Sequence, residues 1–115
     1  MGKFYDNPRR PKREGKKVTV GKVSDLPVGR GATVELNDGS EVALFNVGGK
    51  FHAIENFCPH KGVALADGLL LGQTVECNRH GWKFDVATGE CFTKIGCSIE
   101  SYEVVIEDEM IKILV

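Results

Sequence analysis

Long apolar runs are absent from this sequence of 115 residues, whose length is typical of one domain. No run approaches the roughly 18 apolar residues that are needed to cross a bilayer, so we expect no membrane span. The first 17 residues contain no apolar stretch of the kind that a secretory leader needs, and we expect a cytoplasmic protein. Histidine is scarce too, with three in the chain, so a site that needs two histidines would use most of them.

Basic residues are distributed unevenly along the chain. Seven of the fifteen lysines and arginines lie in residues 1–17, and the rest of the chain carries a net charge of about −6. A basic arm can bind nucleic acid or an acidic membrane surface, but no surface rich in basic and aromatic residues accompanies it elsewhere. We therefore expect a basic flexible tail over residues 1–16, a folded domain over residues 17–115, and no nucleic-acid partner.

The sequence after the tail alternates apolar and polar residues in short segments, which predicts β-strands. Asp38-Gly39, between two such segments, is typical of a tight hairpin because both residues tolerate a positive φ. No segment predicts a helix of ten residues or more, so the expected fold class is all-β. The expected strands cover residues 17–23, 32–37, 41–47, 50–56, 98–107 and 109–115.

Residues 57–97 differ from the segments on either side. They contain all four cysteines of the chain and many turn residues. Only residues 73–77 and 82–86 resemble strands there, and we expect them to pair with each other. The sequence thus predicts a β-rich body that carries a loop-rich insertion.

Cysteine and histidine occur together twice in this insertion, as C-P-H beginning at Cys58 and as C-N-R-H beginning at Cys77. Sixteen residues lie between the two motifs. Cysteine binds metal as the thiolate and histidine as the neutral imidazole. Together, Cys58, His60, Cys77 and His80 would therefore supply a soft, mixed set of sulfur and nitrogen ligands.

Small and rigid residues accompany these candidate ligands. Gly62 and Gly81 follow shortly after the two histidines, and a missing side chain there lets backbone amides approach whatever the ligands hold. Pro59 stiffens the first loop because its ring fixes φ and removes a donor. Both features are typical of loops that surround a bound group.

Several chemistries use such a ligand set. Zinc is one, although structural zinc sites usually place two cysteines on one loop and two histidines on another. A two-iron, two-sulfide cluster is another, with two cysteines on one iron and two histidines on the other. Cys–His nucleophilic catalysis would leave the second pair unexplained. The alternative is that the four residues are unrelated, which the repeated pattern argues against.

The two motifs and their surroundings resemble the cluster-binding loops of Rieske iron–sulfur proteins. The segments that carry the resemblance are CPHKGVALADG from Cys58 and CNRHGWKFDVATGE from Cys77, and weaker similarity extends over residues 18–115. The resemblance implies one [2Fe-2S] cluster per chain, with Cys58 and Cys77 on one iron and His60 and His80 on the other. It also implies a β-sandwich base with a small cluster-binding subdomain over about residues 57–97.

The sequence departs from the high-potential, respiratory kind of Rieske protein. That kind carries an additional, disulfide-bonded cysteine in each loop, where this chain has Val63 and Arg79. It also places Ser and Tyr hydroxyls against the cluster sulfurs, where this chain has Trp82 and Phe84. Hydrogen bonds to the sulfurs raise the potential. We therefore expect a low-potential ferredoxin, with a midpoint near about −150 mV.

The resemblance implies a one-electron carrier that passes electrons from a reductase to a terminal oxygenase. No G-x-G-x-x-G dinucleotide motif is present, so we expect a component of an oxidoreductase system with no active site of its own. The small Rieske subunit of an NAD(P)H-dependent nitrite reductase is the alternative. A zinc-stabilised binding module is the alternative from another class, although the acidic body disfavours nucleic acid.

Three further residues attract attention through their chemistry. Cys91 and Cys97 lie outside both loops, and we expect them to pack as small apolar side chains. A bridge between them or a second metal is the alternative. His52 lies in an alternating segment, and we expect its side chain on the solvent face of a strand.

Overall fold

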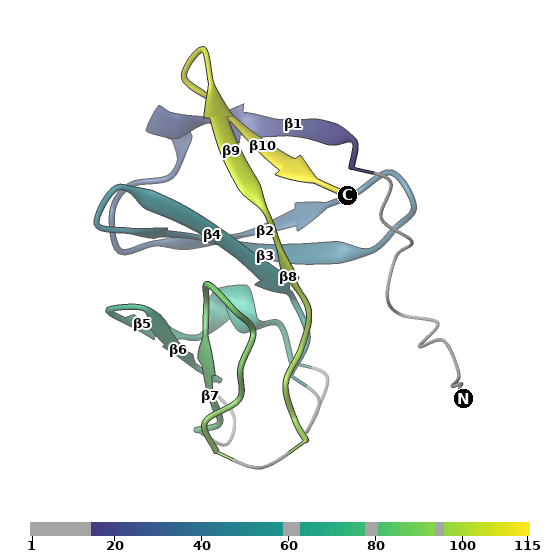
Figure 1. The fold of residues 1–115 in the computed structure, drawn as a ribbon. Coiled ribbons are helices and arrows are strands. Elements are labelled where there is room, and N and C mark those ends of the chain that lie inside the picture. Colours follow the sequence, from purple (N-terminus) through teal and green to yellow (C-terminus); the bar gives the residue numbers. More distant parts are fainter. Residues whose placement is uncertain (1–14, 59–62, 78–80, 94–95) are drawn as a thin grey trace.

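The strands of this protein form three antiparallel sheets (Figure 1). The structure is a computed structural model that describes residues 15–58, 63–77, 81–93 and 96–115. Two three-residue 3-10 turns are the helical elements of this described part, and neither could cross a membrane. The all-β fold class expected from the sequence is confirmed.

The four-stranded sheet forms the centre of the molecule, in the order β2-β3-β4-β8. Two successive hairpins build most of it, and β8 joins through the pairing of Ala53 with Tyr102. The first hairpin turns at Asp38-Gly39, where Gly39 has a φ of 89° and the Asp38 carboxylate accepts a hydrogen bond from the Ser40 amide (2.9 Å). The predicted hairpin at Asp38-Gly39 is confirmed. The strands are β2 (Gly31–Glu35), β3 (Glu41–Val47), β4 (Lys50–Glu55) and β8 (Ser101–Tyr102).

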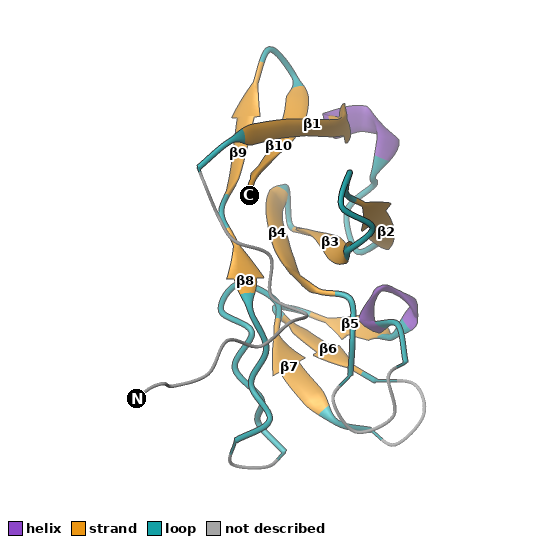
Figure 2. Ribbon diagram, turned by 90° about the vertical axis from the view of Figure 1, so that its right-hand side faces the viewer, coloured by secondary structure: helices purple, strands orange, loops and turns teal. Residues whose placement is uncertain are grey.

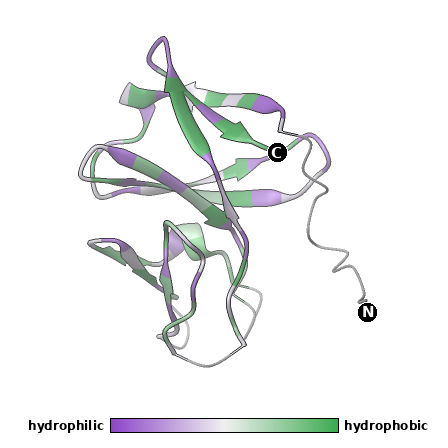
Figure 3. Ribbon diagram, viewed as in Figure 1, coloured by the Kyte–Doolittle hydropathy of each residue, from purple (hydrophilic) through white to green (hydrophobic). Residues whose placement is uncertain are grey.

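A three-stranded sheet joins the beginning of the described chain to its end. Its order is β1-β10-β9, with β1 (Lys17–Lys22), β9 (Val104–Glu107) and β10 (Met110–Leu114). The Glu107 carboxylate lies 2.6 Å from Lys17 Nζ and 3.1 Å from Lys112 Nζ, and these two cations lower the pKa of Glu107 below its usual value. Figure 3 shows the hydrophobic residues that follow one another along β9 and β10. The 3-10 turn η1 (Val23–Asp25) leads from this sheet to the central one.

The smallest sheet lies below the central sheet and has the order β5-β6-β7 (Figure 1). The 3-10 turn η2 (Leu65–Asp67) precedes β5 (Leu69–Leu71), and β6 (Thr74–Glu76) pairs with β7 (Lys83–Asp85). The predicted pairing of 73–77 with 82–86 is thus confirmed. We use "small subdomain" for the described residues between 57 and 99, and "base" for the other two sheets.

The central sheet is buried on both of its faces, because successive side chains of a strand point to opposite sides. On β3, Val42 and Leu44 face one apolar cluster, whereas Ala43 and Phe45 face another. The base core lies between the central sheet and β1-β10-β9: Leu26, Leu36, Val42, Leu44, Phe51, Ala53, Tyr102, Ile111 and Ile113. The subdomain core lies on the opposite face: Ala43, Phe45, Ile54, Cys58, Leu65, Val75, Cys77, Phe84, Val86, Cys97 and Ile99.

Two strand predictions differ from the structure. Residues 98–107 were expected to form one strand, but the chain leaves the central sheet after β8 and enters the other base sheet at β9 (Figure 2). Tyr102, the last residue of β8, packs in the base core at the point where the chain crosses from one sheet to the other. The edge strand β5 was not predicted, because its three leucines do not alternate with polar residues.

Candidate metal centre

Cys58 and Cys77 lie together in the subdomain core, although they come from different parts of the chain. Their exposed fractions are 0% and 1%, and neither is in a disulfide. Cys58 follows β4 of the central sheet, and Cys77 follows β6 of the small sheet. The fold therefore brings the cysteine of each motif into one buried environment.

Backbone hydrogen bonds close the base of each loop. The Cys58 amide donates to the Val63 carbonyl oxygen over 2.9 Å, across the first loop. In the second loop, the Cys77 amide donates to the Trp82 carbonyl oxygen (2.7 Å) and the Gly81 amide donates to that of Cys77 (3.0 Å). These bonds hold the two cysteines where each loop joins the core.

Gly81 ends the second loop with a backbone conformation that favours glycine. Its φ is 73°, and a Cβ there would lie 3.3 Å from a carboxylate oxygen of Glu76. Residues with a side chain adopt this left-handed region at a cost. The glycine that was predicted to allow a close approach is therefore required by the turn itself.

Asn56 connects the start of the first loop to the base, a role that no predicted motif covers. Its side-chain nitrogen lies 3.0 Å from Thr33 Oγ1 and 3.2 Å from a Glu41 carboxylate oxygen, and its oxygen accepts from the Ala66 amide (2.8 Å). Asn56 is 6% exposed and precedes Cys58 by two residues. An asparagine at the end of an apolar strand, next to a candidate ligand, is the signal that could have indicated this role.

The remaining candidate ligands, His60 and His80, lie outside the described residues, as do Pro59, Gly62 and Arg79. Within the described ranges, no three metal-ligating side chains lie together. The ligand set of two cysteines and two histidines stays a prediction.

Trp82 and Phe84 occupy the positions at which the high-potential kind of Rieske protein carries hydroxyl groups. Phe84 is fully buried in the subdomain core, and Trp82 is partly buried and packs against it. The Val63 side chain also packs against this core. The surroundings of the two cysteines are consequently apolar at these three positions.

Cys91 and Cys97 are bonded to each other, which corrects the expectation that they only pack as small apolar side chains. Their Cα atoms are 5.5 Å apart, a separation that is usual for disulfides. The sequence could not show this, because residues 91 and 97 come together only when the intervening chain reverses. Both cysteines still contact the subdomain core, so the predicted packing is part of their environment.

His52 lies on β4 and is partly buried rather than fully on a solvent face. Burial lowers its pKa below the ordinary value of 6.5, while the nearby Asp85 carboxylate acts in the opposite direction and Lys50 in the same direction. Asp85 belongs to β7 of the small subdomain, so His52 faces the junction of that subdomain with the base.

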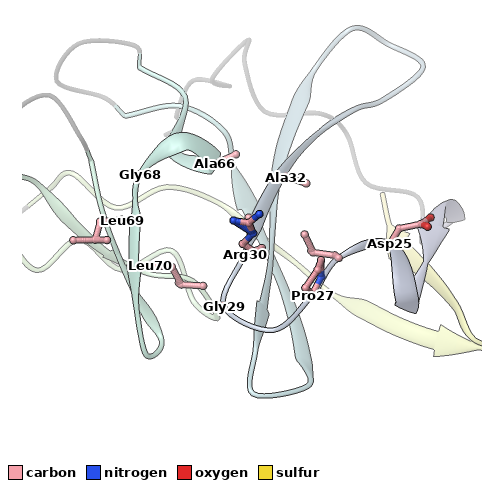
Figure 4. A pocket seen from close by; sticks show the side chains of 11 residues that line it. Asp25, Pro27, Gly29, Arg30, Ala32, Ala66, Gly68, Leu69 and Leu70 are labelled. Carbon is pink, nitrogen blue, oxygen red and sulfur yellow. The ribbon is translucent and has the colours of Figure 1, made fainter.

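A hollow of about 530 Å³ lies elsewhere, between the base and the small subdomain (Figure 4). The segment around Pro27, Gly29 and Arg30 forms one wall, and Leu69 and Leu70 lie on the other. Cys58 and Cys77 do not line this hollow, so it is separate from the candidate metal centre.

Comparison with known proteins agrees with this arrangement. The family model of the Rieske [2Fe-2S] domain matches residues 16–103. The ferredoxin component of the naphthalene 1,2-dioxygenase/salicylate 5-hydroxylase systems of Ralstonia sp is 38% identical over 87 residues, which are 75% of this chain and 83% of that protein.

Two solved structures are similar as well. One is a chain of the complex of reduced oxygenase and oxidized ferredoxin in carbazole 1,9a-dioxygenase, with a TM-score of 0.79 and 27% identity over 88% of this chain and 94% of that chain. The other is the putative NADH-dependent nitrite reductase small subunit from Mycobacterium tuberculosis, with a TM-score of 0.79 and 28% identity over 85% of this chain and 93% of that chain.

The chain belongs to the Rieske [2Fe-2S] domain family. The residues present fit such a cluster. Two buried cysteines without a disulfide lie in one apolar core, and each is held at the base of a loop. Thiolates are costly to bury unless a cation compensates their charge, and the irons of a cluster supply that compensation.

Proposed function

We propose that this protein is a one-electron carrier that passes electrons from a reductase to a terminal oxygenase. In this proposal Cys58, His60, Cys77 and His80 hold a [2Fe-2S] cluster, and the chain has no active site of its own. The observation that carries the proposal is the burial of both Cys58 and Cys77 in the subdomain core of a Rieske-family chain. When bound, the cluster supplies reversible one-electron exchange.

The described residues contribute rigidity and an apolar environment to this role. The backbone hydrogen bonds of Cys58 and Cys77 hold the main chain at both cysteines. Asn56, two residues before Cys58, hydrogen-bonds to Thr33 of β2 and to the Ala66 amide of η2, so its side chain links the small subdomain to the base. A site that changes little in shape during electron exchange needs little reorganisation, which favours rapid transfer.

Phe84 and Trp82 support a low potential. A fully buried phenylalanine and a partly buried tryptophan offer no hydroxyl group to the cluster sulfurs. Since hydrogen bonds to the sulfurs raise the potential, fewer donors lower it. We propose a midpoint near the low end of the Rieske range, about −150 mV, which suits delivery of electrons to an oxygenase.

The relatives favour an oxygenase as the electron acceptor. The Ralstonia protein, which this chain matches over 83% of its length, is a ferredoxin component of dioxygenase and hydroxylase systems. A second candidate function is the small subunit of a nitrite reductase, which the match to the Mycobacterium protein supports. We further propose that the protein works in the cytoplasm, without a nucleic-acid partner.

The first experiment measures iron, acid-labile sulfide and the reduced-state EPR spectrum of anaerobically purified protein. About two irons and two sulfides per chain, with the low average g value of mixed Cys/His ligation, are expected. His60→Ala and His80→Ala should each lose this signal, whereas the matched control His52→Ala should retain it. One zinc and no sulfide would instead show that the two loops form a structural zinc site.

The second experiment identifies the partner. The reduced protein is mixed with a purified Rieske oxygenase or with the flavin- and haem-containing subunit of a nitrite reductase, and its reoxidation is followed by stopped-flow absorbance. A carrier should reoxidise with the oxygenase and remain monomeric between encounters. A stable complex with the nitrite reductase subunit would favour the second candidate function.

A further inference from the structure

The disulfide between Cys91 and Cys97 joins the two arms of one reversal of the chain. The Ile99 amide donates to the Gly89 carbonyl oxygen (2.9 Å), which sets Gly89 opposite Ile99. Two residues farther along each arm, Cys91 faces Cys97, with a Cα–Cα separation of 5.5 Å. The disulfide therefore continues the pairing of the arms, and the "89–99 segment" below means residues 89–93 and 96–99.

The arms approach each other closely at their start. A Cβ added to Gly89 would overlap the carbonyl oxygen of Ile99, and the φ of Gly89 is 81°. Beyond this point the Cys91 amide donates to Ser98 Oγ over 3.2 Å, a bond to a side chain rather than to the opposite backbone. The covalent bond is thus a major link between the arms at the Cys91–Cys97 level.

One arm is also attached to β7, the strand that follows the second cysteine loop. The Phe92 amide donates to the Lys83 carbonyl oxygen (2.8 Å), and the Lys83 amide donates to Thr93 Oγ1 (2.9 Å). Trp82, the neighbour of Lys83, accepts the hydrogen bond of the Cys77 amide. A continuous set of backbone contacts therefore leads from the disulfide to the candidate metal centre.

Packing gives a second connection. Cys97 belongs to the same apolar core as Cys58 and Cys77, and Cys91 packs against that core. Cys91 also forms an isolated β-bridge with Phe84, the buried side chain close to the two cysteines. Any change in the separation of the arms would act on residues that surround the candidate ligands.

The two residues of the bond differ in exposure. Cys97 is 6% exposed, whereas Cys91 is partly buried and is followed by the exposed residues Phe92 and Thr93. A thiolate attacks a disulfide at an accessible sulfur. Cys91 is therefore the sulfur that an external thiolate reaches, and Cys97 is the leaving group.

We propose that Cys91 and Cys97 form a reversible dithiol–disulfide site, at which a dithiol reductant opens the 89–99 segment beside the candidate metal centre. A thiolate of the reductant attacks Cys91 Sγ, the bond to Cys97 breaks, and Cys97 leaves as a thiolate that takes a proton. The second thiol of the reductant then attacks the mixed disulfide and releases the Cys91 thiol. The reductant becomes a disulfide, and two electrons and two protons reach the protein.

This couple is chemically distinct from the one-electron exchange of the proposed function. Its existence does not depend on a cluster, but its influence on the cluster's potential rests on the proposed function. A reduced pair would loosen the 89–99 segment next to Phe84 and Lys83. The thiol–disulfide state of the surroundings would thereby alter the structure of the same subdomain that holds the electron.

The test uses full-length protein that is purified anaerobically without added thiol. It is equilibrated with dithiothreitol at a series of reduced-to-oxidised ratios, quenched in acid, alkylated and analysed by peptide mass. We expect adducts on Cys91 and Cys97 to appear together as the ratio rises, while iron and sulfide content stays constant. Two thiols that fail to rejoin at the lowest ratio, or no opening at any ratio in the folded protein, would overturn the proposal.

Amide hydrogen exchange supplies the structural readout of the same samples. Exchange at Phe92 and Ile99 should become about tenfold faster or more in the dithiol form, and exchange in β3 should be unchanged. The variant C91S/C97S should show the fast rates at every ratio, whereas Ser98→Ala should still respond to the reductant. Equal exchange at Phe92 in the two redox states would refute the opening of the segment.

Measuring iron in every sample separates this proposal from the proposed function. If the protein holds no iron and Cys58 and Cys77 are alkylated as well, the electron-carrier role fails, while the behaviour of Cys91 and Cys97 still decides the dithiol site. If iron is present, the cluster's midpoint is measured in both thiol states, and a reproducible difference is expected.

Discussion

The base and the small subdomain are both built from antiparallel strands, but they are held together differently. In the base, β3 pairs with β4 at six positions and with β2 at five. In the small subdomain, β5–β6 and β6–β7 pair at three positions each. Short ladders and loops stabilise little on their own, and small structural units commonly depend on disulfides or metals.

The distribution of cysteine follows this difference. All four cysteines lie in the small subdomain, two in a disulfide and two in the candidate metal centre. The base core, by contrast, consists of Leu, Val, Ile, Ala, Phe and Tyr side chains. The comparison indicates that the base supplies a stable platform through packing, whereas the subdomain obtains its order from cross-links and from the face of the central sheet.

The largest expected effect comes from removing a candidate ligand. Cys58→Ala or Cys77→Ala should abolish cluster binding, because each removes one of the two cysteine thiolates in the proposed set of four ligands. The base should stay folded, with slow amide exchange in β3 and β4. Iron analysis and hydrogen exchange check both statements.

Cys97→Ala is the matched cysteine control for this prediction. It removes the disulfide but none of the proposed ligands, so about two irons per chain should remain. Full iron content in Cys77→Ala, or complete loss in Cys97→Ala, would contradict the division of the four cysteines into two roles.

Phe45→Ala tests the dependence of the subdomain on the central sheet. Phe45 is 1% exposed and faces the subdomain core from β3. Truncating a buried phenylalanine typically lowers the free energy of unfolding by about 3–5 kcal/mol. Denaturant unfolding should show this loss, while the exposed control Val28→Ala should stay within about 0.5 kcal/mol of the parent. A small loss for Phe45→Ala would mean that the subdomain packs on the base only loosely.

Asn56→Ala weakens the polar junction between the two regions. It removes hydrogen bonds to Thr33, Glu41 and the Ala66 amide, which belong to exposed or partly buried residues. We expect the free energy of unfolding to fall by about 0.5–1.5 kcal/mol. The exposed Asn37→Ala is the matched control and should have an effect below about 0.5 kcal/mol. Equal effects of the two variants would argue against Asn56 as the link.

Phe84→Tyr tests how the apolar surroundings set the potential. The parent midpoint should lie near about −150 mV, and a hydroxyl group beside the cluster should raise it. Phe92→Tyr, at an exposed position of the same subdomain, should leave it unchanged. Protein-film voltammetry measures all three proteins. A parent midpoint above about +100 mV would contradict the low-potential assignment.

The smallest effect is expected from His52, at the junction of the two regions. Burial lowers the pKa of His52, so the unfolded chain binds its proton more readily than the folded protein does. The stabilisation from neutral His52 is therefore present above the ordinary pKa of 6.5 and is lost as the pH falls below it. His52→Gln should flatten the acid side of the stability–pH profile slightly, as measured by thermal unfolding. An unchanged slope would mean that other groups dominate this range.

Local patterns in the sequence determined much of the base and the identity of the site. Alternating apolar residues around Asp38-Gly39 specify a hairpin without help from distant residues, because the turn and both strands are adjacent in the chain. The motifs at Cys58 and Cys77 likewise carry their chemistry locally, since ligand type and spacing indicate the kind of metal group. The family, the fold class and the cofactor followed from these patterns.

Tertiary structure alone decided the features that depend on distant segments. The pairing of β1 with β10, the crossing from β8 to β9 and the two-sided burial of β3 arise from packing between parts of the chain that no local pattern connects. The Cys91–Cys97 bond also belongs here, because a separation of six positions does not specify a reversal. Short-range preferences act within a few residues, whereas burial on both faces of a sheet is determined only when all layers are in place.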